Sequence, residues 1–222
     1  MSLRRQEVLA IFDLDHTLIA GDSDSLWVEF LASRGHLDEN FLNRNADYYR
    51  DYLEGTLDMQ AFLSFQLGYL SGMPLNELKA LRQEFLEDCI RPIVLPKAQS
   101  LVRQHQEQGH ETLIITATNH FVTEPIAELF GIRDLIAVDL EIVEGRLTGR
   151  PLGIPSFREG KAKRLREWLR DRRWSPGTTW FYSDSHNDLP LLSEVDHPVA
   201  VDPDPRLRKK AAARGWLVIS LR

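Results

Sequence analysis

An unbroken apolar run at residues 8–12 is followed at once by Asp13, Asp15 and Thr17. Consecutive β-prone residues without polar alternation are typical of a strand that is buried on both faces, as in a parallel sheet. The polar residues then stand at the carboxyl end of that strand. Open α/β sheets bind their ligands at this edge, so the run predicts both an α/β fold and the place of its site.

Strand and helix patterns alternate through the second half of the chain. Further apolar strand-like runs occur at 112–116, 178–182, 199–201 and 217–219, and helical patterns at 97–108, 120–130, 159–172 and 189–194. Repeated strand–helix units predict a mostly parallel sheet covered by helices on both faces. Two β-like stretches within 136–147, around Glu144-Gly145, predict a hairpin.

Between the first strand and this region the pattern is only helical. Capping and stop residues predict helices at 23–34, opened by Ser23, at 38–55, at 58–72, and from Pro74 onward. We therefore predict an α/β core formed by residues 1–19 and 93–222, with a helical cap at residues 20–92. An insertion at the carboxyl end of a strand lies over the ligand-binding edge, so it could act as a lid.

Composition narrows the classes of partner. The chain has 222 residues and a net charge of −6, and its basic clusters at 161–173 and 206–210 are expected to be solvated helix faces, so nucleic acid is not an expected partner. The single cysteine, Cys89, rules out an internal disulfide. No apolar run reaches the roughly 20 residues that span a bilayer, and no secretory signal is recognised, so we expect a cytoplasmic protein without a membrane partner. The oligomeric state does not follow from these features.

Three predicted strand ends carry polar residues. They are Asp13, Asp15 and Thr17 at the first, Thr116, Thr118 and Asn119 at the second, and Ser183, Asp184, Ser185, Asn187 and Asp188 at the third. Two carboxylate clusters at one edge of a sheet repel each other unless a cation lies between them, and such oxygen ligands favour Mg²⁺. The alternative is that the aspartates are separate turn or cap residues.

Lys161 opens the helix before the third of these strands. Its ammonium group could bind a phosphate and keep a nucleophilic carboxylate ionised. The alternative is a solvated lysine beside Lys163, and the pattern alone leaves both open.

Together these segments resemble the four motifs of the haloacid dehalogenase superfamily. The stretch from Asp13 to Thr17 is similar to the first motif, Thr116 to the second, Lys161 to the third, and residues 184–188 to the fourth, in the expected order. The helical insertion directly after the first motif resembles the branch that includes phosphoserine phosphatase. The resemblance implies a Rossmann-like parallel sheet with an inserted helical cap, and a phosphatase acting on a small phosphorylated metabolite.

The resemblance also implies roles. Asp13 is expected to attack phosphorus and form an aspartyl-phosphate, while Asp15 protonates the leaving oxygen and later deprotonates water. Thr116 and Lys161 are expected to hold the phosphoryl oxygens. Mg²⁺ is expected to be bound by Asp13, the Asp15 main-chain carbonyl and Asp184, with Asp188 orienting water or joining the coordination sphere. The remaining motif residues expected to contact substrate are Thr17, Thr118, Asn119 and Asn187.

Some residues depart from the phosphoserine phosphatase pattern. Ala117 and Thr118 replace two glycines after the second motif, and Ser183 and Ser185 flank Asp184. Residues 20–24 and 116–119 look more like a bacterial group that includes histidinol-phosphate phosphatase-like enzymes. Asp22 stands where phosphoserine phosphatases have a glutamate that binds the substrate amine.

A carboxylate at position 22 suits an amine-bearing phosphomonoester, and histidinol phosphate is favoured over phosphoserine. The alternative is that Asp22 only caps a helix. Arg44 and Asn45 are possible cap contacts of unknown orientation. Two other functions share the motifs: a phosphomutase, which would return the phosphoryl group to its substrate, and a non-catalytic metabolite-binding protein.

Overall fold

The computed structural model describes residues 7–71 and 73–222. Its strands are β1 Val8–Phe12, β2 Glu111–Asn119, β3 Asp134–Val143, β4 Arg146–Leu152, β5 Thr178–Ser183, β6 His197–Val201 and β7 Leu217–Ile219. They form one sheet in the order β4-β3-β2-β1-β5-β6-β7. All neighbours pair in parallel except β3 and β4, the predicted hairpin. The predicted mixed α/β class with a mostly parallel sheet is confirmed.

Helices cover both faces of the sheet. They are α5 Pro96–Glu107, α6 His120–Leu129, α7 Glu159–Asp171, α8 Leu189–Leu192 and α9 Pro205–Arg214. Ala10 and Phe12 of β1 pack in a core with α5 and α6, while Leu9 and Ile11 pack in a second core with α7, α8 and α9. Because successive side chains of a strand point to opposite faces, the apolar run of β1 supplies both cores.

The order of the strands reverses at β1. The chain pairs β2 with one edge of β1, continues to β3 and β4, and then returns to pair β5 with the other edge. Such a reversal leaves a crevice at the carboxyl ends of the strands, where ligands of open α/β sheets bind. Asp13 and Asp15 follow β1 directly into this crevice.

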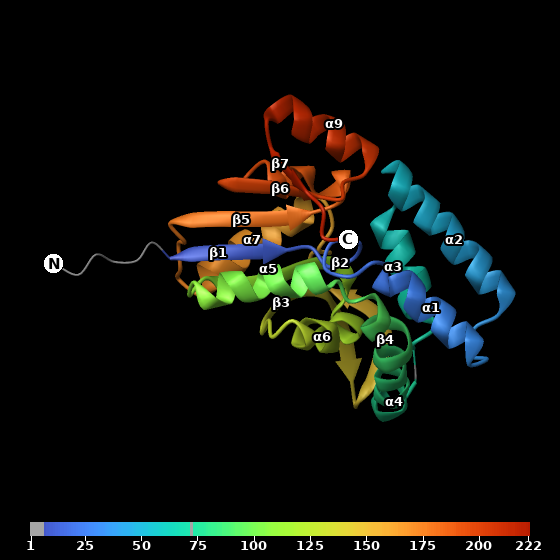
Figure 1. The fold of residues 1–222 in the computed structure, drawn as a ribbon. Helices are drawn as coiled ribbons and strands as arrows, with labels where there is room; N and C mark the ends of the chain where they lie inside the picture. Colours follow the sequence, from blue (N-terminus) through green and yellow to red (C-terminus); the bar gives the residue numbers. More distant parts are fainter. Residues whose placement is uncertain (1–6, 72) are drawn as a thin grey trace.

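Four helices lie between β1 and α5: α1 Ser23–Ser33, α2 Glu39–Glu54, α3 Met59–Gly68 and α4 Leu75–Phe85. A π-helical turn at Leu86–Ile90 and a 3₁₀ turn at Arg91–Ile93 lead from α4 to α5. In Figure 1, α1, α2 and α3 lie beyond the arrowheads of β1 and β5, over the carboxyl ends of the strands. We call these four helices the cap. The predicted residue boundaries of the cap and the core stay a prediction.

One predicted helix start was wrong. Asp22, not Ser23, caps α1, because its Oδ1 accepts a hydrogen bond of 2.7 Å from the Ser25 amide while the Ser23 amide binds Asp15. The third helix ends at Gly68, and the predicted end near Gly72 lies outside the described residues. The backbone of β4 packs closely against this helix end.

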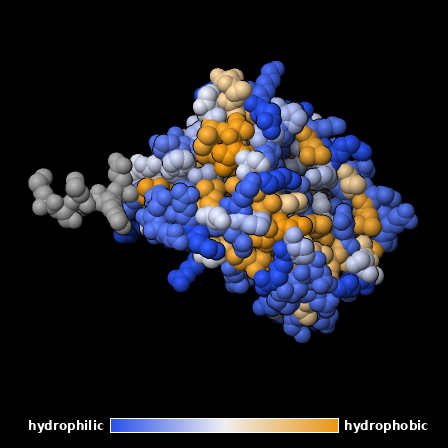
Figure 2. All heavy atoms as spheres, in the orientation of Figure 1, coloured by the Kyte–Doolittle hydropathy of each residue, from blue (hydrophilic) through white to orange (hydrophobic). Residues whose placement is uncertain are grey.

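The surface is mixed in polarity. Figure 2 shows a face that is mostly hydrophilic, with hydrophobic residues gathered where Figure 1 places β6 and β7. Leu217 and Val218 of the edge strand β7 are 56% and 39% exposed. Within residues 7–71 and 73–222, no helix has both the length and the apolar character needed to cross a membrane.

Candidate active site

Three buried charged side chains meet where β1, β5 and the start of α7 converge. Lys161 Nζ donates hydrogen bonds to Asp13 Oδ1 at 2.7 Å and to Asp188 Oδ2 at 2.8 Å. Burial raises the pKa of both carboxyl groups, to about 6 for Asp188, and Lys161 opposes that rise. Burial alone would lower the pKa of Lys161, but the two carboxylates outweigh it and raise that pKa. Lys161 is therefore a permanent cation beside Asp13.

A turn at Gly160 directs Lys161 toward Asp13. A Cβ at this position would lie 2.0 Å from the carbonyl oxygen of Pro155, so only glycine fits. Arg158 has a positive φ of 50°, which is uncommon for a residue other than glycine. The first turn of α7 therefore packs closely against the backbone of Pro155, and Lys161 projects from that turn.

Thr17 links the two acidic segments. Its Oγ1 lies 3.3 Å from Asp13 Oδ2 and 3.2 Å from Asp184 Oδ1, and it accepts a hydrogen bond of 3.1 Å from the Asp184 amide. Burial, followed by repulsion from Asp13 and Asp188, raises the pKa of Asp184 well above its usual value. A cation between Asp13 and Asp184 would relieve that repulsion.

The donor set suits Mg²⁺. Within the described residues, no three His, Cys, Asp or Glu side chains are grouped to hold a metal. Magnesium usually takes only one or two protein carboxylates and completes its shell with water and substrate phosphate. The carboxylates of Asp13 and Asp184, with the Asp15 main-chain carbonyl, fit that pattern.

Asp15 is held through both carboxylate oxygens. Its Oδ1 accepts a hydrogen bond of 2.7 Å from the Ser23 amide, and its Oδ2 accepts from Thr118 Oγ1 at 2.9 Å and Thr116 Oγ1 at 3.3 Å. Burial, and then repulsion by Asp22, raises the pKa of Asp15. A carboxyl group with a raised pKa is suited to hold and deliver a proton.

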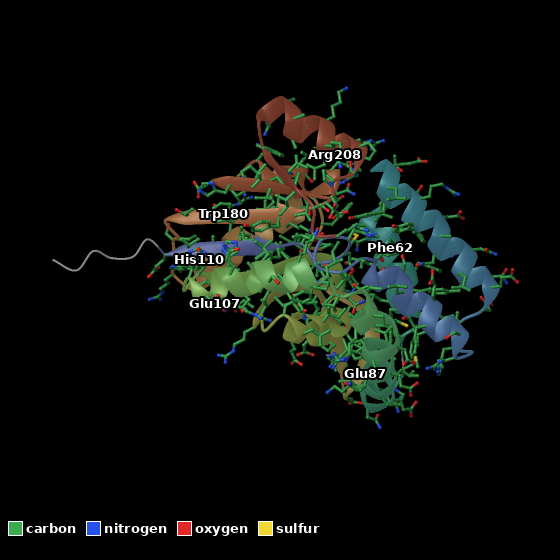
Figure 3. All side chains as sticks on the ribbon, viewed as in Figure 1. Phe62, Glu87, Glu107, His110, Trp180 and Arg208 are labelled. Atoms are coloured by element: carbon green, nitrogen blue, oxygen red, sulfur yellow. The ribbon has the colours of Figure 1, made fainter. Side chains whose placement is uncertain are left out.

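A cavity lies between the core and the cap above these groups. Its core side includes Asp13, Asp15, Thr116, Thr118, Lys161 and Asp188, and its cap side includes Asp22, Asp24, Asn45, Tyr48, Tyr49, Tyr52 and Phe62. In Figure 3, Phe62 lies between the cap helices and the strand ends. The cavity therefore joins the predicted phosphate-binding groups to polar and aromatic residues of the cap.

Three residues that were predicted to contact substrate lie beside this cavity but do not line it: Thr17, Asn119 and Asn187. Asn119 Oδ1 caps α6 by accepting a hydrogen bond of 3.1 Å from the Val122 amide. Asn187 Nδ2 donates to the Tyr52 carbonyl at 3.2 Å. The hydrogen bonds of these three residues connect segments around the site. Their contacts with substrate stay predictions. Asp22 both caps α1 and lines the cavity.

Asn45, named from the sequence as a possible cap contact, lines the cavity, whereas Tyr49 and Tyr52 line it and were not identified from the sequence. Tyr52 Oη lies 3.5 Å from Ser185 Oγ. Burial, and then the charge of Asp13, raises the pKa of Tyr52 well above its usual value. Tyr49 Oη lies 3.3 Å from His16 Nε2. Asn45, Tyr49 and Tyr52 are spaced by four and three residues along α2, the spacing of one helix face. This spacing could have identified them as a group.

The family model described as haloacid dehalogenase-like hydrolase matches residues 10–193. The chain belongs to the haloacid dehalogenase-like hydrolase family. The resemblance inferred from the four motifs is therefore confirmed, and the chain is a phosphatase of this family.

Similar proteins include a histidinol-phosphatase from Neisseria meningitidis serogroup C, which is 46% identical over 96% of this chain and 99% of its own length. A phosphoserine phosphatase from Mycobacterium tuberculosis is 31% identical over 96% of this chain and 70% of its own length. A crystal structure of a protein of unknown function from Bordetella pertussis Tohama I matches with a TM-score of 0.92 and 45% identity, covering 98% of this chain and 100% of that one.

A substrate-bound phosphoserine phosphatase structure matches with a TM-score of 0.72 over 97% of this chain and 94% of that chain. Its sequence identity is 17%, so this likeness concerns the fold alone.

Proposed function

We propose that this phosphatase is a magnesium-dependent hydrolase of histidinol phosphate that works through an aspartyl-phosphate on Asp13. The buried contact between Lys161 and Asp13, at a cavity that Asp22 and Asp24 also line, is the observation that carries the proposal. The 46% identity to the histidinol-phosphatase of Neisseria meningitidis supports the choice of substrate. In this proposal residues 20–92 form the cap over a core of residues 1–19 and 93–222.

In the first step a carboxylate oxygen of Asp13 attacks phosphorus and the ester P–O bond breaks. The carboxyl group of Asp15 gives its proton to the leaving alcohol oxygen, and its raised pKa supports the presence of that proton. Lys161 neutralises a phosphoryl oxygen and keeps Asp13 ionised, while Thr116 donates a hydrogen bond to another oxygen. When bound by Asp13, Asp184 and the Asp15 carbonyl, Mg²⁺ supplies further positive charge for the transition state.

In the second step Asp15, now ionised, removes a proton from a water molecule that attacks the aspartyl-phosphate. The P–O bond to Asp13 breaks, inorganic phosphate leaves, and the proton remains on Asp15 for the next cycle. Splitting hydrolysis in two lets one carboxyl group serve first as the acid and then as the base.

Asp22, on the cap side of the cavity, is the proposed partner of the substrate amine. Its capping bond to Ser25 uses Oδ1. Asp22 also lines the cavity, and a carboxylate there suits an ammonium group by direct charge pairing.

The test is phosphate release with Mg²⁺ from histidinol phosphate, phosphoserine and a neutral sugar phosphate, with Asp13→Asn as the inactive control. We expect histidinol phosphate to give the highest kcat/KM. Preference for a neutral sugar phosphate, with both amine-bearing esters inert, would contradict the proposed substrate and the role of Asp22.

The same assay separates the alternatives. A phosphomutase would return the phosphoryl group and release less than one phosphate per substrate consumed. A non-catalytic binding protein would release none from any ester, and Asp13→Asn would leave its binding function intact.

A further inference from the structure

Two buried side-chain oxygens on the cap side of the cavity lack a hydrogen-bond partner among the described residues. They are Asp24 Oδ1 and Asn45 Oδ1, and both residues line the cavity. Asp24 is 9% exposed and Asn45 is 8% exposed. A buried acceptor without a donor costs about 1–3 kcal/mol, so native proteins rarely keep one without a use. Because both residues line one cavity, these oxygens point to a ligand that supplies the missing donors.

A hydrogen bond from helix α3 fixes the side chain of Asp24 in place. Asp24 lies on α1, and the side-chain amide of Gln66 on α3 donates a hydrogen bond to its Oδ2. Gln66 is itself 3% exposed, so this bond is shielded from water. With one oxygen bound to Gln66, the carboxylate keeps the other for a ligand.

The charge around Asp24 favours a cationic ligand. Burial, and then repulsion by Asp22, raises the pKa of Asp24 well above its usual value. A positive group between Asp22 and Asp24 would pair with both carboxylates. An ammonium group bound to Asp22 alone would leave the carboxylate of Asp24 without a cationic partner.

The neighbouring walls are aromatic. Tyr48, Tyr49 and Phe62 line the same cavity, and the rings of Tyr48 and Phe62 are 5.5 Å apart at an angle of 60°. Aromatic faces attract flat cations, and unpaired oxygens at the edge of such a pocket accept hydrogen bonds from N–H groups. A flat, protonatable heterocycle with two N–H groups combines both requirements.

We propose that Asp24 and Asn45 form a second nitrogen-binding subsite, which accepts N–H hydrogen bonds from an imidazolium-like ring at the end of the substrate remote from its phosphate. The inference rests on the proposed histidinol phosphate hydrolysis and assigns the ring to residues other than Asp22. In this arrangement Asp22 binds the amine, and Asp24 with Asn45 distinguishes ring-bearing substrates from simple amino alcohol phosphates.

Asp24→Asn tests the subsite at nearly constant volume. The asparagine oxygen can still accept from Gln66, so its amide nitrogen would meet the N–H groups of the ring. We expect the ratio of kcat/KM for histidinol phosphate to kcat/KM for p-nitrophenyl phosphate to fall at least about tenfold, the usual cost of losing a hydrogen bond to a charged group. Asn45→Leu removes the second acceptor and should lower the same ratio at least about threefold.

Binding is measured separately from turnover. Calorimetry with the inactive Asp13→Asn enzyme should give a Kd for histidinol phosphate that rises at least about tenfold when Asp24→Asn is added. The Kd for phosphoethanolamine, which has the amine and no ring, should rise less. Asp38→Asn is the matched control, because Asp38 caps α2 at an exposed position outside the described lining of the cavity and should leave the ratio unchanged.

The outcomes separate the two proposals. If the native enzyme hydrolyses other phosphomonoesters and ignores histidinol phosphate, the proposed substrate is wrong and the subsite is wrong with it. If the native enzyme prefers histidinol phosphate but both folded variants keep the native ratio within about twofold, the substrate stands and the subsite is overturned. Melting curves establish which variants are folded, and Asn45→Leu decides the question if Asp24→Asn does not fold.

Discussion

The guanidinium group of Arg206 donates a hydrogen bond of 2.6 Å to the main-chain carbonyl oxygen of Glu54. Arg206 lies in the first turn of α9 in the core, and Glu54 is the last residue of α2 in the cap. Arg158 donates to the next carbonyl, that of Gly55. Carbonyl groups at the end of a helix have no partner within it. Core side chains therefore supply partners for carbonyl groups at the end of α2 and connect the cap to the core.

Arg206→Ala should loosen the attachment of α2 to the core and weaken substrate binding. Losing one hydrogen bond to an exposed cation is worth only about 0.5–1 kcal/mol, so we expect KM to rise roughly threefold with little change in melting temperature. Steady-state kinetics measure this change. Arg208→Ala is the control, because Arg208 is exposed on the same helix (Figure 3). An equal rise of KM in both variants would show that the effect is general electrostatics and not the contact with Glu54.

Lys161→Met should abolish turnover and also weaken the fold. The variant leaves Asp13 and Asp188 buried without their cation, and breaking such a buried pair costs roughly 3–5 kcal/mol. Denaturant unfolding at pH 8 should reveal this loss, which should shrink at pH 5 as the carboxyl groups become protonated. Lys163→Met, at an exposed position on the same helix, should be near neutral. Native stability of Lys161→Met at pH 8 would contradict the buried ion pair.

Asp184→Asn should stabilise the metal-free protein while destroying its activity. Burial, Asp13 and Asp188 all raise the pKa of Asp184, which means that its ionised form is unfavourable in the fold. Removing that charge should raise the free energy of unfolding in EDTA by on the order of 1 kcal/mol. Added Mg²⁺ should raise the melting temperature of the native protein more than that of the variant. An equal Mg²⁺ shift in both proteins would exclude Asp184 as a ligand.

The sequence predicted the part of the site that directly follows the first strand. The apolar run of residues 8–12 identified β1, and its carboxyl end correctly located Asp13 and Asp15 at the reversal of strand order. Lys161 could not be chosen over Lys163 from the pattern, because the choice depends on the close approach of Gly160 to Pro155. That approach is a tertiary contact, and no local pattern encodes it.

The cap was harder to predict in detail. Its helices were recognised from their caps, but which helix face meets the core depends on packing between elements. Asp24 and Tyr52 line the cavity because α1 and α2 turn those positions toward β1. The spacing of Asn45, Tyr49 and Tyr52 marks one face of α2 but does not say that this face meets the core.

Asp188 should make the metal-free protein less stable as the pH rises. Its pKa in the folded state is raised from 3.8 to about 6, mainly by burial. The folded state therefore binds more protons than the unfolded state between these values. Protonated Asp188 therefore contributes fully to the free energy of unfolding below pH 4, and this contribution is lost as the pH rises through 6.

The comparison is between the native protein and Asp188→Asn, both unfolded by urea in EDTA from pH 4 to 7.5. The free energy of unfolding of the native protein, relative to the variant, should fall over this range by up to roughly 3 kcal/mol, since each pKa unit corresponds to 1.4 kcal/mol. Asparagine cannot titrate, so groups that do not interact with Asp188 cancel in the difference. A difference that grows with pH would mean that Lys161 dominates Asp188 and lowers its pKa, since pairing favours the ionised carboxylate. In that case the ion pair between Lys161 and Asp188 would increase the free energy of unfolding at neutral pH. If burial dominates instead, ionised Asp188 decreases that free energy.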